Sequence, residues 1–178
     1  MKKAIHLLLL ACLSINTSAN PLNDSAKIQI LRYPSSLNDL LSQYRGKVIY
    51  IDVMASWCKP CIVELKESKN LDSFFEDNDI IKIYISIDQR QDIDKCLSLL
   101  NQYNAKGYFV PYQPPQDGAA NFASDVETLF LKNDKGEYDI SIPKYAIVDK
   151  DGNIVVKRAE RPSNKEGLIS QLKEWVKK

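Results

Sequence analysis

The segment Trp57-Cys58-Lys59-Pro60-Cys61 decides the fold expected for this chain of 178 residues. It follows an apolar run at residues 48–54 and precedes a helix-like stretch at residues 62–75. Two cysteines separated by two residues at a strand-to-helix junction can close a small disulfide on the first helical turn. The unpaired N–H groups and the helix dipole at this end favour a thiolate at Cys58. This arrangement predicts a redox site.

The N-terminal residues have the pattern of an export signal. Met1-Lys2-Lys3 is followed by an apolar stretch at residues 4–13, which is too short to span a membrane. Thr17-Ser18-Ala19 then supplies small residues for cleavage before Asn20. The remaining chain suits one globular domain, because 44% hydrophobic and 26% charged residues are enough for one core.

A second processing route is also open, because Leu9-Leu10-Ala11-Cys12 resembles a bacterial lipoprotein box in which Cys12 becomes acylated. Ordinary cleavage is favoured, since the apolar stretch is short and this cysteine lies early. We therefore expect a signal peptide at residues 1–19, a linker at 20–26 and one domain at 27–178. Either route predicts a protein of the bacterial periplasm or cell envelope.

Charge and composition exclude several classes of function. Removing the signal takes away two lysines, which changes the formal net charge from +1 to −1. That balance predicts neither nucleic-acid binding nor electrostatic docking to a membrane. The single histidine, His6, is lost as well, so the mature chain has no imidazole base or metal ligand. Three cysteines remain, an odd number that argues against a disulfide framework.

Strand-like and helix-like segments alternate along the chain, which favours an α/β fold with parallel central strands. The signals are helix caps, β-branched runs and turn residues. The expected helices cover a segment from Ser35 or Ser36 to Gly46, then residues 62–75, 92–103 and 124–131, and a last segment with a capping box of Ser163 and Glu166. The expected strands are residues 47–54, 80–87 and 107–110, and a hairpin of 144–149 and 153–157.

This order of elements resembles the thioredoxin fold, in which a central mixed β-sheet is flanked by helices. More narrowly, Ala55-Ser56-Trp57-Cys58-Lys59-Pro60-Cys61 and the segment 147–153 resemble the exported thiol-disulfide oxidoreductases of the TlpA/ResA type. Members of that group are membrane-tethered or periplasmic reductants, and several serve cytochrome c maturation. The resemblance implies protein disulfides as substrates, a membrane thiol donor and no bound cofactor. The loop at residues 111–121 has no counterpart in the thioredoxin core.

The two cysteines are expected to have different roles. Disulfide exchange needs one thiolate that attacks and a second thiol that resolves the mixed disulfide. Cys58 lies nearer the helix start and is the expected nucleophile, with Cys61 as the resolving thiol. A purely structural disulfide is disfavoured, because so small a loop removes little entropy from the unfolded chain. A zinc site would need another ligand pair, so no metal is expected, and Cys96 is interpreted as a buried small hydrophobic residue.

The residues beside the cysteines tune the redox balance. Pro60 stiffens the turn. Lys59 is expected to lower the Cys58 pKa modestly, and the alternative is a solvated lysine whose effect is screened. A histidine between the cysteines would make the disulfide more oxidising, and none is present. By resemblance, a residue followed by proline at these positions points to a reductant. Trp57 is expected to shield the thiol and to offer contact surface, with core packing as the alternative.

Two carboxylates are candidates for proton transfer. Asp52 lies inside an apolar strand, where burial would raise its pKa and let it exchange a proton with Cys61. It also matches the buried aspartate of thioredoxins in position, and the alternative is a water-facing residue on an edge strand. Glu64 lies three residues after Cys61 on the same helical face and matches the active-site glutamate of the ResA-like group. A solvated helix glutamate is an equal alternative.

Ile142-Pro143 precedes the hairpin and fits, by resemblance, the cis-proline loop that faces the CxxC pair. The implied role is to present the backbone of Ile142 to an extended substrate, whereas the plainer alternative is a trans proline at a strand start. Tyr108, Phe109 and Tyr112 could line a groove, but core packing is favoured.

The sequence therefore predicts an exported thiol-disulfide oxidoreductase that reduces protein disulfides. The alternatives are a binding module with relic cysteines, and a disulfide isomerase or oxidant with the same site. Thiol peroxidase chemistry is disfavoured, because the chain lacks a Pro-x-x-x-Thr-x-x-Cys pattern.

Overall fold

The computed structural model describes residues 28–31, 33–112 and 120–178. The expected signal peptide at residues 1–19, the lipoprotein-box cysteine Cys12 and the linker at 20–26 lie outside the described residues, as does most of the loop at 111–121. Within the described ranges no helix is long and apolar enough to cross a membrane.

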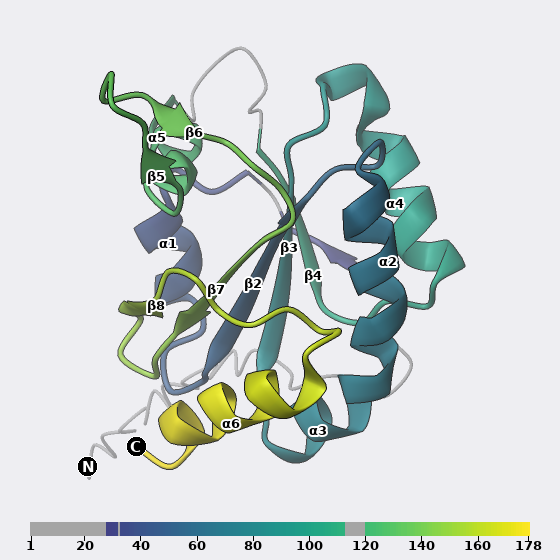
Figure 1. The fold of residues 1–178 in the computed structure, drawn as a ribbon, viewed down its shortest axis with the longest axis vertical. Helices are drawn as coiled ribbons and strands as arrows, with labels where there is room; N and C mark the ends of the chain where they lie inside the picture. The colour runs from purple at the N-terminus through teal and green to yellow at the C-terminus, as the bar shows by residue number, and fades with distance from the viewer. Residues whose placement is uncertain (1–27, 32, 113–119) are drawn as a thin grey trace, which may run out of the picture.

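A six-stranded mixed sheet forms the centre of the molecule, with strand order β1-β4-β3-β2-β7-β8 (Figure 1). β2 is central, parallel to β3 and antiparallel to β7. β1 and β4 continue the parallel part, and β8 pairs antiparallel with β7. This confirms the predicted mixed sheet. The strand bounds are β1 Gln29–Ile30, β2 Ile49–Met54, β3 Ile81–Ser86, β4 Tyr108–Pro111, β7 Lys144–Val148 and β8 Ile154–Val156.

Helices cover both faces of this sheet (Figure 1). One face packs against α1 (Leu37–Ser42) and α5 (Ala120–Glu127). The other face packs against α2 (Lys59–Ser68), α3 (Asp72–Asp77), α4 (Ile93–Gln102) and α6 (Lys165–Val176). A 3-10 turn at Lys69–Leu71 separates α2 from α3, so the single helix predicted for residues 62–75 is two helices. α1 begins after Ser36, whose hydroxyl accepts the Asp39 N–H, as an N-cap does.

Alternation along β2 determines which residues face the active-site helix. Successive side chains of a strand point to opposite faces, and all six residues of β2 are buried. Ile49, Ile51 and Val53 pack in the cluster of α1 and α5. Tyr50 and Met54 pack in the clusters of the opposite face, and Asp52 lies between them on that face. The only carboxylate of β2 therefore faces the layer that contains α2.

Two local predictions are wrong. The capping box of Ser163 and Glu166 does not form, because Asn164 is the N-cap of α6 and its side chain accepts the Gly167 N–H at 3.3 Å. The helix predicted at residues 124–131 is α5, which ends four residues earlier. Leu131 lies instead in a small hairpin of β5 (Leu131–Lys132) and β6 (Tyr138–Asp139). Strands of two residues are too short to show an alternating pattern in the sequence.

Candidate active site

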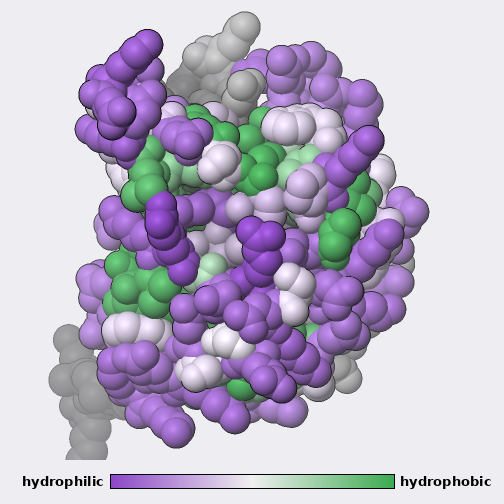
Figure 2. Space-filling view, viewed as in Figure 1, coloured by the Kyte–Doolittle hydropathy of each residue, from purple (hydrophilic) through white to green (hydrophobic). Residues whose placement is uncertain are grey.

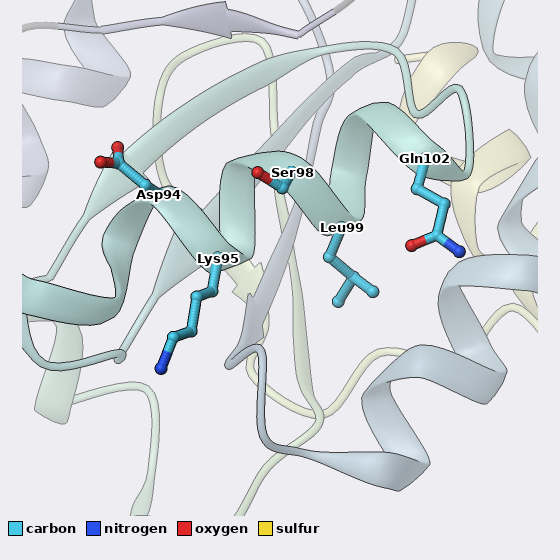
Figure 3. Close-up of a pocket in the computed structure, with 5 residues that line it drawn as sticks. All are labelled: Asp94, Lys95, Ser98, Leu99 and Gln102. Atoms are coloured by element: carbon cyan, nitrogen blue, oxygen red, sulfur yellow. The ribbon is translucent and has the colours of Figure 1, made fainter.

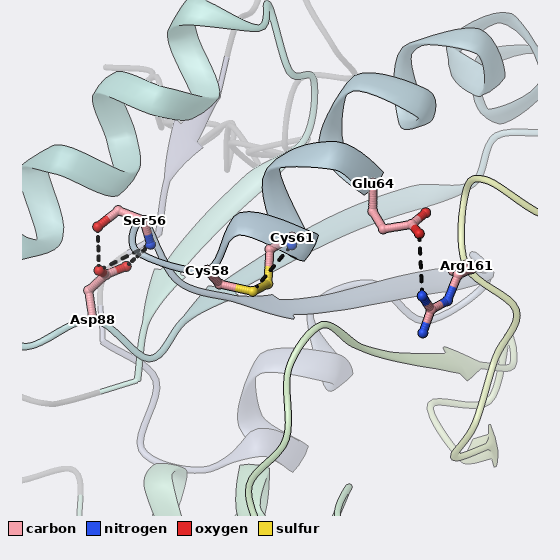
Figure 4. Close-up of a disulfide and its surroundings, with 6 residues drawn as sticks. All are labelled: Ser56, Cys58, Cys61, Glu64, Asp88 and Arg161. Atoms are coloured by element: carbon pink, nitrogen blue, oxygen red, sulfur yellow. Dashed lines mark hydrogen bonds and ion pairs between the residues drawn. A yellow bond between two sulfur atoms is a disulfide. The ribbon is translucent and has the colours of Figure 1, made fainter.

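Cys58 and Cys61 form a disulfide at the junction of β2 and α2 (Figure 4). Their Cα atoms lie 5.3 Å apart. Cys58 is the N-cap of α2, and its sulfur accepts the backbone N–H of Cys61 at 3.2 Å. Pro60 occupies the first turn, where a helix needs no N–H donor. The predicted placement of the CxxC pair between strand and helix is confirmed.

The disulfide is buried, whereas its neighbours in sequence are exposed. Cys58 and Cys61 retain 4% and 2% of their accessible surface. Lys59 and Pro60 are exposed, and Trp57 is 63% exposed, so the core-packing alternative for this tryptophan is wrong. The face of the molecule drawn in Figure 2 is mostly hydrophilic, with separate hydrophobic patches. Trp57, Lys59 and Pro60 thus form an exposed rim beside the buried sulfur atoms in the chain.

Asp52 is buried on the central strand, so the edge-strand alternative is wrong. The pKa of this carboxyl is raised to about 7, chiefly by burial, which the positive charge of Lys82 opposes and the negative charge of Glu64 assists. Its Oδ1 atom has no hydrogen-bond partner within the described part of the chain. A carboxyl with a pKa near neutrality can both accept and release a proton.

Lys82 is a second buried charge on this face, and sequence reasoning missed it. Its ammonium group donates to Asp72 Oδ1 at 2.7 Å and to Ser68 Oγ at 3.3 Å. It also lies 5.0 Å from the centre of the Phe75 ring. The sequence feature that could have revealed it is a lysine inside the β-branched run at residues 80–87, because a cation buried there requires a partner.

Glu64 is buried, so the solvated alternative is wrong. Its carboxylate accepts the backbone N–H and the hydroxyl of Ser163, each at 2.9 Å. The Arg161 guanidinium lies 3.6 Å away and is about half exposed (Figure 4). These contacts fasten α2 to the loop that precedes α6, and they explain why Ser163 does not cap that helix.

Asp88 is a further residue of the site that sequence reasoning missed. It is fully buried just after β3. Its carboxylate accepts the Ser56 N–H at 2.9 Å and the Ser56 hydroxyl at 2.6 Å (Figure 4). It also accepts the Ser86 hydroxyl at 2.7 Å. The contacts fix the segment directly before Trp57. The sequence feature that could have revealed this residue is an aspartate directly after the buried β-branched run at residues 80–87. The second feature is a serine, Ser56, in the segment that contains the two cysteines.

Cys96 lies in the same buried cluster as the two bonded cysteines and is a free thiol. Burial raises its pKa to about 12, which disfavours a thiolate. The structure therefore agrees with its interpretation as a small hydrophobic residue.

Phe109 is likewise buried in this cluster, and the Tyr112 hydroxyl donates to Glu127 at 2.6 Å. The favoured core-packing interpretation holds for Phe109.

The Ile142–Pro143 peptide bond is cis in the structure. Ile142 is partly buried and packs against the cluster that contains Cys58 and Cys61. The chain thus brings this segment, about 80 residues away in sequence, to the redox pair. A role for it in substrate binding stays a prediction.

Within the described residues no group of three or more His, Cys, Asp or Glu side chains lies close enough to hold a metal ion.

A shallow depression of about 360 Å³ lies on α4 (Figure 3). All the residues that line it come from this one helix, whereas the disulfide lies at the start of α2. They are Asp94, Lys95, Ser98, Leu99 and Gln102.

The mixed sheet, its two helical layers and the CxxC pair define a thioredoxin-like protein. Residues 33–174 match the model of the Redoxin family, which covers most of the chain. The chain therefore belongs to the Redoxin family.

The individual proteins that this chain is similar to share about a third of its residues or fewer over the matched part. An uncharacterized protein of Haemophilus influenzae is 32% identical over 97 residues, which cover 53% of this chain. The matched part spans only 58% of that curated relative. A candidate thiol-disulfide oxidoreductase of Bacteroides vulgatus is 29% identical with a TM-score of 0.54, over 76% of this chain and 82% of its own. A candidate thiol:disulfide interchange protein DsbE of Chlorobium tepidum has the same fold, with 19% identity and a TM-score of 0.57, over 76% and 84% of the two chains.

The raised pKa of Asp52 predicts that this residue destabilises the oxidised protein at high pH. Between pH 3.8 and about 7 the folded state keeps a proton that the unfolded state releases, so stability falls as pH rises through this window. The full difference corresponds to about 4 kcal/mol. Asp52→Asn should therefore be more stable than the wild type at pH 8, with an advantage that shrinks toward pH 4. Urea unfolding at pH 4, 6 and 8 measures this.

The matched control is Asp77→Asn, at an exposed position at the end of α3. Its effect should be small at every pH. A stability difference between Asp52→Asn and the wild type that does not change with pH would contradict the assignment.

Proposed function

We propose that this protein is a thiol-disulfide oxidoreductase that reduces disulfides of other proteins by dithiol exchange. The observation that carries the proposal is the Cys58–Cys61 disulfide at the N-terminus of α2, on the sheet face where Asp52 is buried with a pKa near 7. Membership in the Redoxin family supports this function, as does the activity assigned to the similar Bacteroides vulgatus protein.

The reaction begins from the reduced pair. The Cys58 thiolate attacks one sulfur of a substrate disulfide, and the other substrate sulfur leaves as a thiolate. Cys61 then loses its proton to Asp52 and attacks the Cys58 sulfur, which releases the second substrate thiolate. Two electrons have passed to the substrate, and the enzyme holds a Cys58–Cys61 disulfide. The Cys61 N–H bond to the Cys58 sulfur supports Cys58 as the more stable thiolate.

The exposed rim supplies contacts for the substrate. Trp57, Lys59 and Pro60 surround the buried sulfur atoms, and Ile142 packs against their cluster. In this proposal the backbone of Ile142, held next to Pro143, pairs with an extended segment of the substrate. Glu64 serves the site from α2, where it adds negative charge near Asp52.

The direction of electron flow is proposed from the residues between the cysteines. No histidine stabilises the Cys58 thiolate there, and Pro60 follows the pattern of reductants. In an oxidising compartment a reductant needs a continuous electron source, so a membrane thiol donor belongs to the proposal. In this proposal the two cysteines transfer the electrons themselves, without a bound cofactor.

The proposal is tested by insulin reduction with dithiothreitol as electron source, on a chain that starts at Asn20. Cys58→Ser should abolish the activity, because it removes the attacking thiolate. Cys96→Ser is the matched control and should keep a rate close to the wild type. A wild-type protein that leaves insulin oxidised would favour the binding-module alternative, and loss of activity in Cys96→Ser would contradict the two-cysteine mechanism.

Export is proposed from the N-terminal pattern alone. We expect expression in a bacterial host to yield a mature chain that begins near Asn20, in the periplasmic fraction. Intact-mass measurement of the purified protein tests this. A lipid-modified N-terminus at Cys12 would contradict ordinary cleavage, and an uncleaved N-terminus in the cytoplasm would contradict export.

A further inference from the structure

Three buried polar atoms of the sheet without a hydrogen-bond partner in the described residues lie on the same face. They are Asp52 Oδ1 and the hydroxyls of Tyr84 and Tyr145. Tyr84 lies on the β3 side of Asp52, next to the buried charge of Lys82, and Tyr145 lies on the β7 side. Asp52 and Tyr145 are 5% and 4% exposed. Asp52 of β2 is the register partner of Tyr145 of β7. Directly paired residues on neighbouring strands have Cβ atoms about 5 Å apart and side chains on one face. The tyrosine therefore stands beside the carboxyl that is proposed to take the Cys61 proton.

The Tyr145 ring packs beside a tyrosine that contacts the loop before α6. It stacks on the Tyr50 ring, with centroids 5.4 Å apart and an angle of 6° between the planes. The Tyr50 hydroxyl donates to the backbone oxygen of Glu160 at 2.9 Å. The Ala159 N–H, which donates to the Tyr145 backbone oxygen at 3.1 Å, holds the loop against β7.

Two residues of that loop contact Glu64 of α2. Ser163 donates twice to the Glu64 carboxylate, and Arg161, about half exposed, is ion-paired with it. Asp52, Glu64 and Arg161 all act electrostatically on the Tyr145 hydroxyl. Burial raises the pKa of Tyr145, so the hydroxyl stays protonated and can donate and accept a hydrogen bond at the same time.

Leaving a buried carboxylate oxygen and a buried hydroxyl unpaired destabilises the folded protein. Internal water bound by such groups removes that cost. We propose that Asp52 Oδ1 and the Tyr145 hydroxyl bind internal water, and that this column carries the proton of Asp52 to the buried carboxylate of Glu64, beside which the half-exposed Arg161 reaches solvent. The relay rests on the proposed function. In each turnover one proton leaves the Cys61 thiol, passes through Asp52 and the water–tyrosine column, and reaches solvent.

Charged groups from each neighbouring element bear on Asp52. Lys82 of β3 lowers its pKa, and Glu64 of α2 raises it. Asp72 of α3 is ion-paired with Lys82, and Arg161 with Glu64. Removing the Tyr145 hydroxyl changes none of these charges. A change in proton transfer in Tyr145→Phe is therefore attributable to the column itself.

The test compares Tyr145→Phe with Tyr50→Phe. Both lose one hydroxyl from the same ring stack, but the Tyr50 hydroxyl is already bonded to Glu160. In stopped-flow reduction of a small aromatic disulfide at pH 7, Tyr145→Phe should be about tenfold slower. Added imidazole, a small proton carrier, should restore most of the rate. Tyr50→Phe should react within about twofold of the wild type and should not respond to imidazole.

A wild-type rate in Tyr145→Phe would overturn the relay, and so would a slow rate that imidazole does not restore. The water site has a test that needs no activity, which is a crystal structure of the oxidised protein at about 1.2 Å resolution. An ordered water bonded to both the Tyr145 hydroxyl and Asp52 Oδ1 is expected, and its absence would overturn the water site. If the wild type failed to reduce any disulfide, the proposed function would fall while this crystallographic result would still decide the water site.

Discussion

The alternation of side chains along β2 is the constraint on which the rest of the site depends. In a strand buried on both faces, alternate side chains point into opposite layers. In β2 the aliphatic residues Ile49, Ile51 and Val53 pack against α1 and α5. Asp52 is then left on the face covered by α2, whose first turn carries the cysteines. A shift of one residue in register would place the carboxyl in an aliphatic cluster and would remove it from the redox pair.

The buried acids of this face differ in how many donors they have, and this difference assigns their roles. Asp88 accepts three different donors, and Glu64 accepts two hydrogen bonds and pairs with Arg161. Such contacts hold loops in place. Asp52 Oδ1 has no partner in the described residues, so burial dominates its pKa. Asp52 is therefore the acid proposed to exchange a proton with Cys61, whereas the contacts of Asp88 and Glu64 hold the segments on either side of the disulfide.

The features that the sequence predicted are local in the chain. The CxxC pair, the apolar run of β2 and the turn between β7 and β8 are each visible within about ten residues, and so is a carboxylate in a buried strand. The missed contacts join distant residues. Glu64 and Ser163 are 99 positions apart, and Ser56 and Asp88 are 32 apart. Neither periodicity nor a cap pattern in the sequence reveals such a pair. The contact of Ser163 with Glu64 therefore replaces the capping box that the sequence predicts at this serine.

A Cys58–Cys61 pair that works as a reductant must have a low reduction potential. Equilibration of the purified protein with glutathione redox buffers, followed by alkylation and mass analysis, gives the value. We expect a potential nearer to the roughly −270 mV of thioredoxin than to the roughly −120 mV of a strong periplasmic oxidant. A potential above about −160 mV would contradict this expectation and would indicate a disulfide donor or isomerase.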